Sequence, residues 1–220
     1  MSDPHPPRTL GAILYPDFEL LDYYGPLEMF GSTGHGLKIV TVSEQAGPVC
    51  SVQGPCTVAD YSFATAPSLD LILLPGGIGT MEQLGNGAML DFLRQRSAPA
   101  EVVMSVCSGS AILARAGLLD GRSATSNKMF FSLATDQSDK VQWVQQARWV
   151  EDGKFVTSSG VSAGTDMALA VIAKLYGRAH AEMVAVMTEY EWHSDASRDP
   201  FAQYVNQGNI QEYLALLGRA

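Results

Sequence analysis

The chain has 220 residues, of which 46% are hydrophobic and 17% are charged, a composition typical of a globular protein with a sizeable core. Its net charge of −9 and the lack of Lys/Arg clusters argue against a nucleic-acid partner, because phosphate binding requires clustered positive charge. No apolar run approaches the ~18 residues of a membrane span, and the N-terminus MSDPHPPRTL lacks the apolar segment of a signal peptide. We therefore expect no membrane partner, and a flexible leader over residues 1–8.

Short apolar runs alternate with helix-like segments along the chain. In chain order, the patterns predict a strand at 8–15, a helix at 22–34, strands at 37–43 and 69–77, a helix at 81–97, a strand at 101–107, and helices at 108–121, 163–177 and 179–192. Pro26 suits the first turn of its helix, and alternating runs around Gly54-Pro55 and Asp152-Gly153 indicate antiparallel pairs. Strand–helix alternation predicts an α/β fold with a mostly parallel, doubly wound sheet and helices on both faces. We expect one domain over 1–220, with a C-terminal extension at 193–220.

The chain contains three cysteines, Cys50, Cys56 and Cys107. A small, odd number favours the reducing cytoplasm. Cys50 and Cys56, in CSVQGPC, have no histidine nearby, so we expect no zinc site. Their spacing allows a disulfide, which we do not expect.

Cys107 stands at the junction of the apolar run EVVMSVC and the helical segment SGSAILARAGLLDG. In an open parallel sheet the active crevice lies at the carboxyl ends of the strands, where this residue is predicted to lie. Its small neighbours permit the tight turn of a nucleophile elbow, although S-x-C-x-G matches the generic motif only in part. The start of the helix offers free N–H groups and the positive end of a dipole, so we expect a lowered thiol pKa. The alternative is a buried structural cysteine.

A nucleophile needs a proton partner, and none of the four histidines lies beside Cys107 in the sequence. The segment YPDFELLDYYGP follows the first predicted strand and carries Asp17, Glu19 and Asp22. Asp22 is flanked by apolar and aromatic residues, and desolvation there would raise its pKa and make it a usable acid. A helix N-cap is an equally good interpretation of Asp22.

Four segments, FELLDYYGPLEMF, LILLPGG, VCSGSAILARAGLLDGRSATSNK and VTSSGVSAGTDMAL, resemble the DJ-1/PfpI superfamily, and within it the isocyanide (isonitrile) hydratase branch. The resemblance runs over about residues 9–190. It implies a flavodoxin-like α/β sandwich, usually a homodimer, that acts on a small molecule without a cofactor or a metal.

The resemblance also implies roles for individual residues. Cys107 corresponds to the reactive cysteine and Asp22 to the general acid/base, while Ser108 corresponds to a hydroxyl residue that assists in the site. Further matching positions lie in the glycine loop whose amide faces the thiol, in the loop that packs against the cysteine, and after the glycine-closed helix: Gly76, Gly77, Ser159, Val161 and Asn127.

Two departures from the family patterns narrow the predicted function. Ser108 stands where the protease-like branch has a histidine, which weighs against peptidase activity. Asn127 replaces the histidine of the A-T-T-H pattern, and because an amide cannot titrate, the proton transfers fall to Asp22 and Cys107. The helix-turn-helix region of related regulators is not expected to fit in the residues after 192.

We therefore predict a cytoplasmic hydratase that adds water to an isocyanide carbon and releases an N-formamide, through a thioimidate on Cys107 with Asp22 as general acid and then base. Glyoxalase-type hydration of 2-oxoaldehydes stays open, as does a redox-sensing or protective protein whose Cys107 oxidises to a sulfinate. One group of residues could line an apolar pocket or belong to the core: Tyr23, Tyr24, Met129, Phe130 and Phe131.

Overall fold

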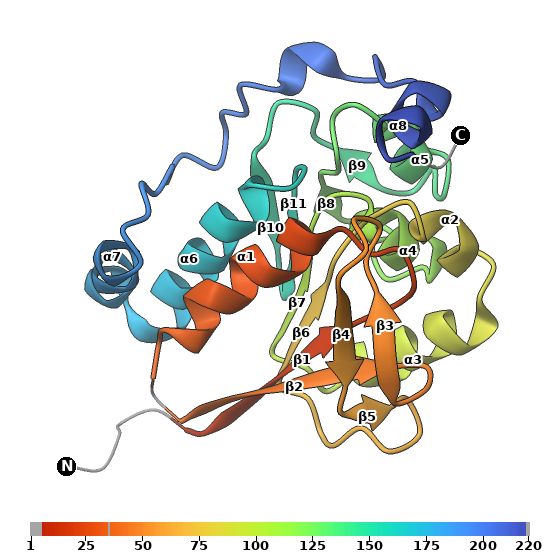
Figure 1. Cartoon of the computed structure of the whole chain (residues 1–220). Coiled ribbons are helices and arrows are strands. Elements are labelled where there is room, and N and C mark those ends of the chain that lie inside the picture. Colours follow the sequence, from red (N-terminus) through yellow and green to blue (C-terminus); the bar gives the residue numbers. More distant parts are fainter. Residues whose placement is uncertain (1–5, 35, 219–220) are drawn as a thin grey trace.

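A seven-stranded sheet forms the centre of the structure, a computed structural model that describes residues 6–34 and 36–218 (Figure 1). The strands follow the order β10-β11-β7-β6-β1-β2-β5. In chain order their bounds are Arg8–Ile13 (β1), Leu37–Ser43 (β2), Tyr61–Ser62 (β5), Leu71–Leu74 (β6), Val102–Ser105 (β7), Trp149–Asp152 (β10) and Phe155–Ser158 (β11). Every neighbouring pair is parallel except β10 and β11.

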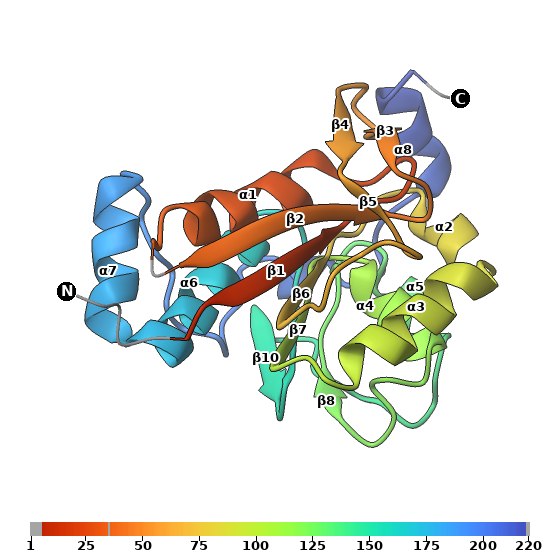
Figure 2. The same ribbon diagram turned by 90° about the horizontal axis from the view of Figure 1, so that it is seen from below.

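Helices cover both faces of this sheet (Figure 2). One face carries α1 (Leu20–Gly31), α6 (Ala163–Tyr176) and α7 (Arg178–Met187), and the other carries α3 (Gly87–Ser97) and α4 (Gly109–Arg115) with the short helices α2 (Thr80–Gln83) and α5 (Phe131–Thr135). Alternate residues of the central strands fill the two cores: Leu71 and Leu73 pack with residues of α6, while Ile72 and Leu74 pack with residues of α3 and α4. The predicted α/β class is confirmed.

The order of the parallel strands is that of a flavodoxin-like fold. From β1 the chain moves to β2 on one side, and then returns to the other side of β1 with β6, β7 and β11. The direction of winding therefore changes between β1 and β6. In open α/β sheets ligands bind outside the carboxyl ends of the strands at such a switch point, so the loops after β1, β6 and β7 define the expected site.

Both predicted antiparallel pairs are confirmed. β10 pairs with β11 around Asp152-Gly153, and β3 (Gly47–Cys50) pairs with β4 (Cys56–Ala59). A second small sheet pairs β8 (Ser123–Ala124) with β9 (Gln142–Trp143). Cys50 and Cys56 are opposite residues of the β3–β4 pair and form a disulfide. The expectation of two free thiols there is wrong, because the register of the two strands brings the cysteines face to face.

The helix predicted around Pro26 begins earlier than expected. α1 begins at Leu20, so Pro26 lies inside the helix and not in its first turn. Proline removes the hydrogen bond to the carbonyl four residues earlier. The packing of α1 against α6 and β2 maintains the helix despite this loss.

The predicted 81–97 helix is two helices. α2 ends at Gln83, and α3 begins at Gly87. The side chain of Asn86 caps α3, because its Oδ1 accepts hydrogen bonds from the N–H groups of Ala88 (3.0 Å) and Met89 (3.3 Å). This cap breaks the apolar pattern into two segments.

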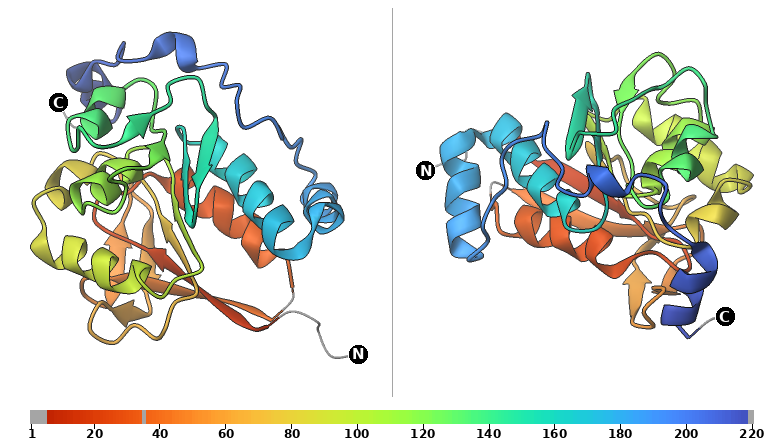
Figure 3. Two further views of the ribbon diagram at one scale, coloured as in Figure 1. Left: turned by 180° about the vertical axis from the view of Figure 1, so that it is seen from behind. Right: turned by 90° about the horizontal axis from the view of Figure 1, so that it is seen from above.

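The predicted C-terminal extension crosses the molecule from the end of α7 to a last helix beside α5 (Figures 1 and 3). It contains a 3-10 turn at Ala202–Tyr204 and the helix α8 (Ile210–Leu216). Residues 219–220 of the extension, and residues 1–5 of the predicted leader, lie outside the described residues. Across the part of the chain that the structure describes, no helix has the length and apolar character needed to cross a membrane.

Candidate active site

Cys107 lies between β7 and α4, at the carboxyl edge of the sheet. Its φ of 57° is in the left-handed region, which costs a non-glycine residue about 1–2 kcal/mol. Hydrogen bonds hold the turn: the Cys107 N–H donates to the Ser159 carbonyl (3.0 Å), and the hydroxyls of Ser110 and Ser126 donate to the Cys107 carbonyl (3.1 Å each). The thiol is therefore fixed at the edge where this class of fold binds ligands.

Asp22 is fully buried in the first turn of α1, beside Cys107. Its Oδ2 accepts a hydrogen bond from the Gly76 N–H (2.9 Å), whereas Oδ1 has no well-formed hydrogen bond within the described residues. Burial and the charge of Glu19 raise the pKa of Asp22 to about 8, against the opposing effects of the Gly76 N–H, the Cys107 thiol and the Val161 N–H. The carboxyl group is thus protonated at neutral pH. The N-cap interpretation is wrong, because Glu19 occupies that position.

The pKa of the Cys107 thiol lies well above its ordinary value, because the thiol is buried and faces the Asp22 carboxyl group. The Ser108 N–H and the Asn127 amide, whose Nδ2 lies 3.1 Å from Sγ, act in the opposite direction without outweighing burial. The predicted lowering of this pKa is wrong, because desolvation of a buried thiolate exceeds the effect of the start of α4. Thiol and carboxyl are both uncharged at neutral pH.

Gly76 and Gly77, which follow β6, approach the site closely. A Cβ at Gly76 would lie 2.6 Å from the Ser108 nitrogen and 2.9 Å from Asp22 Oδ2. The Ser108 hydroxyl accepts a hydrogen bond from the Gly77 N–H (3.1 Å) and shares another with the Thr80 hydroxyl (2.9 Å). Glycine at 76 is therefore required for the carboxyl group, the loop and residue 108 to meet.

Two further loops complete the site. Ser159 holds the Cys107 backbone through its carbonyl, and Val161 has a φ of 41°, in the left-handed region. The Asn127 Oδ1 accepts a hydrogen bond from the Phe130 N–H (3.0 Å), which leaves Nδ2 to donate to Sγ. The structure thus brings all eight predicted site residues together around the thiol.

A cavity of ≈ 550 Å³ leads to Cys107. Five of the eight predicted site residues line it: Gly77, Cys107, Ser108, Asn127 and Val161. The other three lie beside them without lining the cavity: Asp22, Gly76 and Ser159. Cys107 is therefore exposed to a space large enough for a small organic molecule, and Asp22 lies directly behind it.

The aromatic and apolar group from the sequence divides between pocket, core and surface. Met129 and Phe130 line the cavity. Tyr23 and Phe131 are buried in the core, and Tyr24 is exposed, with its hydroxyl 2.6 Å from the Thr57 hydroxyl. The tertiary structure therefore decides which of these residues line the pocket and which belong to the core, because the sequence alone does not specify burial.

Two of the cavity residues to which the sequence assigned no role, Glu19 and Tyr213, contact each other. Glu19 was one of three carboxylates in its segment, and Tyr213 lies in α8 of the C-terminal extension. The Tyr213 hydroxyl donates a hydrogen bond to Glu19 Oε2 (3.0 Å) across 194 positions of sequence. The helical pattern of IQEYLALLG indicates α8, but no local pattern shows where that helix docks.

The fold and the site define a flavodoxin-like α/β protein with a buried, uncharged cysteine–carboxyl pair at the switch point of its sheet. The chain belongs to the DJ-1/PfpI family, whose model matches residues 11–174. The predicted resemblance to this family, and within it to the isonitrile hydratases, is confirmed.

Known relatives include both enzymes and regulators. The chain is 33% identical over 186 residues to the isonitrile hydratase of Pseudomonas putida, covering 82% of this chain and 78% of that protein. It is 28% identical over 221 residues to the HTH-type transcriptional regulator GbdR of Pseudomonas aeruginosa, covering 96% of this chain but only 60% of the regulator. The crystal structure of a THiJ/PfpI family protein from Pseudomonas syringae is similar with a TM-score of 0.78 and 32% identity, over 97% of this chain and 86% of that chain.

Proposed function

We propose that the protein is a cysteine-dependent hydratase that adds water to the terminal carbon of an isocyanide and releases an N-formamide. The observation that carries this proposal is the buried Asp22 carboxyl group, protonated at neutral pH, beside the thiol of Cys107. The similarity to an isonitrile hydratase over most of its length supports this class of reaction.

An uncharged acid beside an uncharged thiol suits an uncharged substrate whose reactive carbon must gain both a proton and a nucleophile. Oδ2 of Asp22 accepts the Gly76 N–H, so the carboxyl proton belongs on Oδ1, which has no well-formed hydrogen bond within the described residues. In the proposed reaction this proton is transferred to the isocyanide carbon.

The first step forms a covalent adduct. The sulfur of Cys107 bonds to the terminal carbon while Asp22 delivers its proton to the same carbon, and the carboxylate takes up the proton that the thiol releases. The product is a thioimidate, S–CH=N–R, with Asp22 protonated again. The Cys107 backbone, held in the left-handed conformation of a nucleophile elbow, supports the role of the sulfur as nucleophile.

The second step consumes water. Asp22 protonates the imine nitrogen and, as a carboxylate, accepts a proton from the water that attacks the carbon. The tetrahedral adduct then collapses: the C–S bond breaks, the sulfur takes the proton of Asp22, and the resulting Asp22 carboxylate takes the hydroxyl proton, which restores both groups. One carboxyl group serves as acid and base in turn, so the proposal needs neither a histidine nor a cofactor.

The remaining predicted residues are proposed to position these groups. Ser108 and Gly77 face each other at the cavity wall, and Asn127 donates to the sulfur. A donor to sulfur stabilises developing thiolate character when the C–S bond breaks. Ser159 and Gly76 hold the Cys107 backbone and the Asp22 carboxyl group, respectively.

Redox sensing is the weaker alternative. Oxidation to a sulfenate and then a sulfinate begins from a thiolate, and burial beside Asp22 raises the pKa of Cys107 and disfavours that form. Glyoxalase-type hydration uses the same two residue types, so methylglyoxal consumption serves as the comparison reaction.

The setting of the enzyme is also part of the proposal. We propose a homodimer that acts on a small molecule without a nucleic-acid partner. A cytoplasmic location stays a prediction, and the Cys50–Cys56 disulfide removes the support that free cysteines would have lent it.

Turnover of an aryl isocyanide, followed by ultraviolet absorbance, tests the proposal. We expect loss of activity in Cys107→Ala and a decrease of about 10²–10⁴-fold in Asp22→Asn, the usual contribution of a general acid or base. Asp91→Asn, an exposed carboxylate on α3, is the matched control and should turn over normally. Unchanged turnover in Cys107→Ala would overturn the mechanism.

The pH dependence of turnover follows from the ionisation of Asp22. The reaction starts from the protonated carboxyl group, and this form is lost as the pH rises through the Asp22 pKa of about 8. We therefore expect kcat/KM to be level below this pH and to fall above it. A profile that rises through pH 8 would instead indicate that a carboxylate is required at the start.

A further inference from the structure

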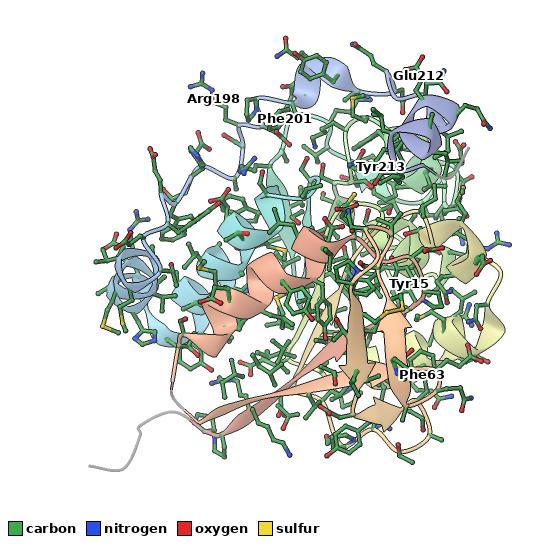
Figure 4. The ribbon with its side chains drawn as sticks, in the orientation of Figure 1. Tyr15, Phe63, Arg198, Phe201, Glu212 and Tyr213 are labelled. Carbon is green, nitrogen blue, oxygen red and sulfur yellow. A yellow bond between two sulfur atoms is a disulfide. The ribbon has the colours of Figure 1, made fainter. Side chains whose placement is uncertain are left out.

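The C-terminal segment 207–216 forms one wall of the cavity that leads to Cys107. Ile210, Tyr213 and Leu216 contribute apolar surface to this wall, and the Tyr213 ring packs against the ring of Phe130, which also lines the cavity, with 5.9 Å between the ring centroids. Figure 4 shows Tyr213 on the side of α8 that faces the rest of the molecule. The extension therefore helps to shape the pocket.

Backbone hydrogen bonds hold this wall against the loop that carries Asn127. The Asn206 N–H donates to the Lys128 carbonyl and the Gly208 N–H donates to the Met129 carbonyl, each at 2.9 Å. The Ser132 N–H donates to Asn206 Oδ1 (2.7 Å). The wall is thus joined to residues directly after Asn127, the donor to the thiol.

Tyr213 is fixed in place from the other side by Glu19. The Tyr213 hydroxyl donates to Glu19 Oε2 (3.0 Å), and the Gln53 side-chain amide donates to Glu19 Oε1. Gln53 lies in the loop closed by the Cys50–Cys56 disulfide. Glu19 therefore acts as a positioning residue between the β3–β4 pair and α8.

The described charged side chains that line the cavity are all acidic. Among the described residues that line it there is no lysine, arginine or histidine, and there are three acidic side chains, Glu19, Asp136 and Glu212. A negatively charged ligand entering this space would lose hydration, gain no cationic partner and face like charges.

We propose that Tyr213, held by Glu19, is a specificity-determining residue, and that with the acidic side chains of the cavity it restricts access to Cys107 to molecules that carry an apolar group and no negative charge. This inference rests on the proposed function for its substrate, an isocyanide. It is tested first by alkylation of the thiol, which needs no catalytic turnover. A failure of this inference can therefore be distinguished from a failure of the proposed function.

The charge selection is measured by alkylation of the Cys107 thiol. Iodoacetamide and iodoacetate have matched size and differ by one negative charge, and Cys107 is the free cysteine among the described residues. Labelling rates are read by mass spectrometry, and their ratio is divided by the ratio for 2-mercaptoethanol. We expect a normalised preference of at least about tenfold for iodoacetamide, because like charges in a confined site oppose entry. A normalised ratio near one would overturn the proposal.

Variants assign this preference to the cavity. The double variant Asp136→Asn/Glu212→Gln removes two charges at nearly constant shape, and the preference for iodoacetamide should decrease several-fold. Asp91→Asn/Glu182→Gln removes two charges from exposed ion pairs elsewhere and should retain the preference. Equal ratios in the two double variants would contradict the role of the acidic cavity residues.

The apolar selection is measured with N-phenylmaleimide and N-ethylmaleimide. The native chain should prefer the phenyl reagent relative to a free thiol, Tyr213→Phe should retain much of this preference, and Tyr213→Ala should lose it. Circular dichroism checks that each variant is folded. An undiminished preference in folded Tyr213→Ala would overturn the role of Tyr213.

A second variant displaces the wall without altering Tyr213. A Cβ at Gly208 would lie 2.6 Å from Phe130 Cε1 and 2.8 Å from the Met129 carbonyl oxygen, so Gly208→Ala must move the segment outward. Gly87→Ala, where a Cβ would meet nothing within 4 Å, is the matched control. We expect a lowered preference for N-phenylmaleimide in Gly208→Ala and an unchanged preference in Gly87→Ala. Equal preferences in the two variants would contradict the role of segment 207–216 in selecting apolar groups.

Isocyanide turnover then separates this inference from the proposed function. Methyl isocyanoacetate and isocyanoacetate differ by a negative charge, and we expect kcat/KM to favour the ester by at least about tenfold. If alkylation is selective but no isocyanide is consumed, the proposed function fails and the pocket selectivity stands. If both isocyanides are consumed equally and alkylation is unselective, the inference fails and the hydratase stands.

Discussion

Asp22 illustrates how one buried residue links stability to function. Its pKa is raised from 3.8 to about 8, so between these values the folded protein holds a proton that the unfolded chain has lost. Unfolding then releases a proton, and the free energy of unfolding contributed by Asp22 falls as the pH rises across this window. A carboxyl group kept ready as an acid therefore lowers stability at neutral and alkaline pH.

Asp22→Asn removes this ionisation and keeps an oxygen that can accept the Gly76 N–H. We expect the variant, although impaired in turnover, to be more stable by about 0.5–2 kcal/mol at pH 8, with the difference shrinking toward pH 4. Urea denaturation of both proteins across this pH range measures the effect. A stability difference independent of pH would show that Asp22 is ionised alike in the folded and unfolded chains.

At the scale of elements, the β3–β4 pair supports the segment that carries Glu19. The Asp17 N–H donates to the Cys50 carbonyl (2.9 Å), and the Val52 N–H donates to the Phe18 carbonyl (3.0 Å). The disulfide joins the two strands at their ends beside this contact. The pair is therefore a support for one side of the pocket as well as a small sheet.

Removal of the disulfide should destabilise the protein moderately. Cys50 and Cys56 are six positions apart, and closing so short a loop contributes about 2 kcal/mol, or about 4–8 °C in Tm. Calorimetry of Cys50→Ser/Cys56→Ser against the native chain, each with and without dithiothreitol, measures this. Dithiothreitol should lower the Tm of the native chain and leave that of the double variant unchanged. An equal decrease of Tm in the double variant would show that the reductant does not act through the disulfide.

At the scale of the whole molecule, a buried ion pair anchors the start of the C-terminal extension. Arg148 Nε donates to Asp166 Oδ2 (2.6 Å), and Asp166 Oδ1 accepts hydrogen bonds from the Tyr190 hydroxyl (3.1 Å) and the His193 N–H (2.9 Å). Asp166 is fully buried in α6. One carboxylate thus joins the residue directly before β10, helix α6 and the extension that ends in the pocket wall.

Asp166→Ala should therefore have a large effect. It leaves Arg148 buried, with Asp199 as a more distant partner (3.9 Å), and we expect a loss of about 3 kcal/mol or more. Hydrogen exchange should also accelerate between Tyr190 and His193. Asp91→Ala, in an exposed ion pair, should cost less than about 0.5 kcal/mol, and equal losses in the two variants would exclude the anchoring role.

Much of the fold is predictable from the sequence because its signals are local. Continuous apolar runs indicate buried parallel strands, and Asp152-Gly153 indicates a turn whatever the rest of the chain does. The two incorrect helix boundaries have different causes. α1 contains Pro26 because the helix packs against α6 and β2, whereas Asn86 divides the 81–97 segment through a local cap that the apolar pattern does not reveal.

By itself the sequence determined the class of fold, the family, and the placement of Cys107 and Asp22 near one sheet edge, since strand order in α/β folds brings strand ends together. Only the tertiary structure decided that both groups are uncharged, because burial, and not the nearby helix start, dominates their pKa values. It also decided that Tyr213 closes one side of the pocket. A contact across 194 positions depends on the path of the whole chain and leaves no local pattern.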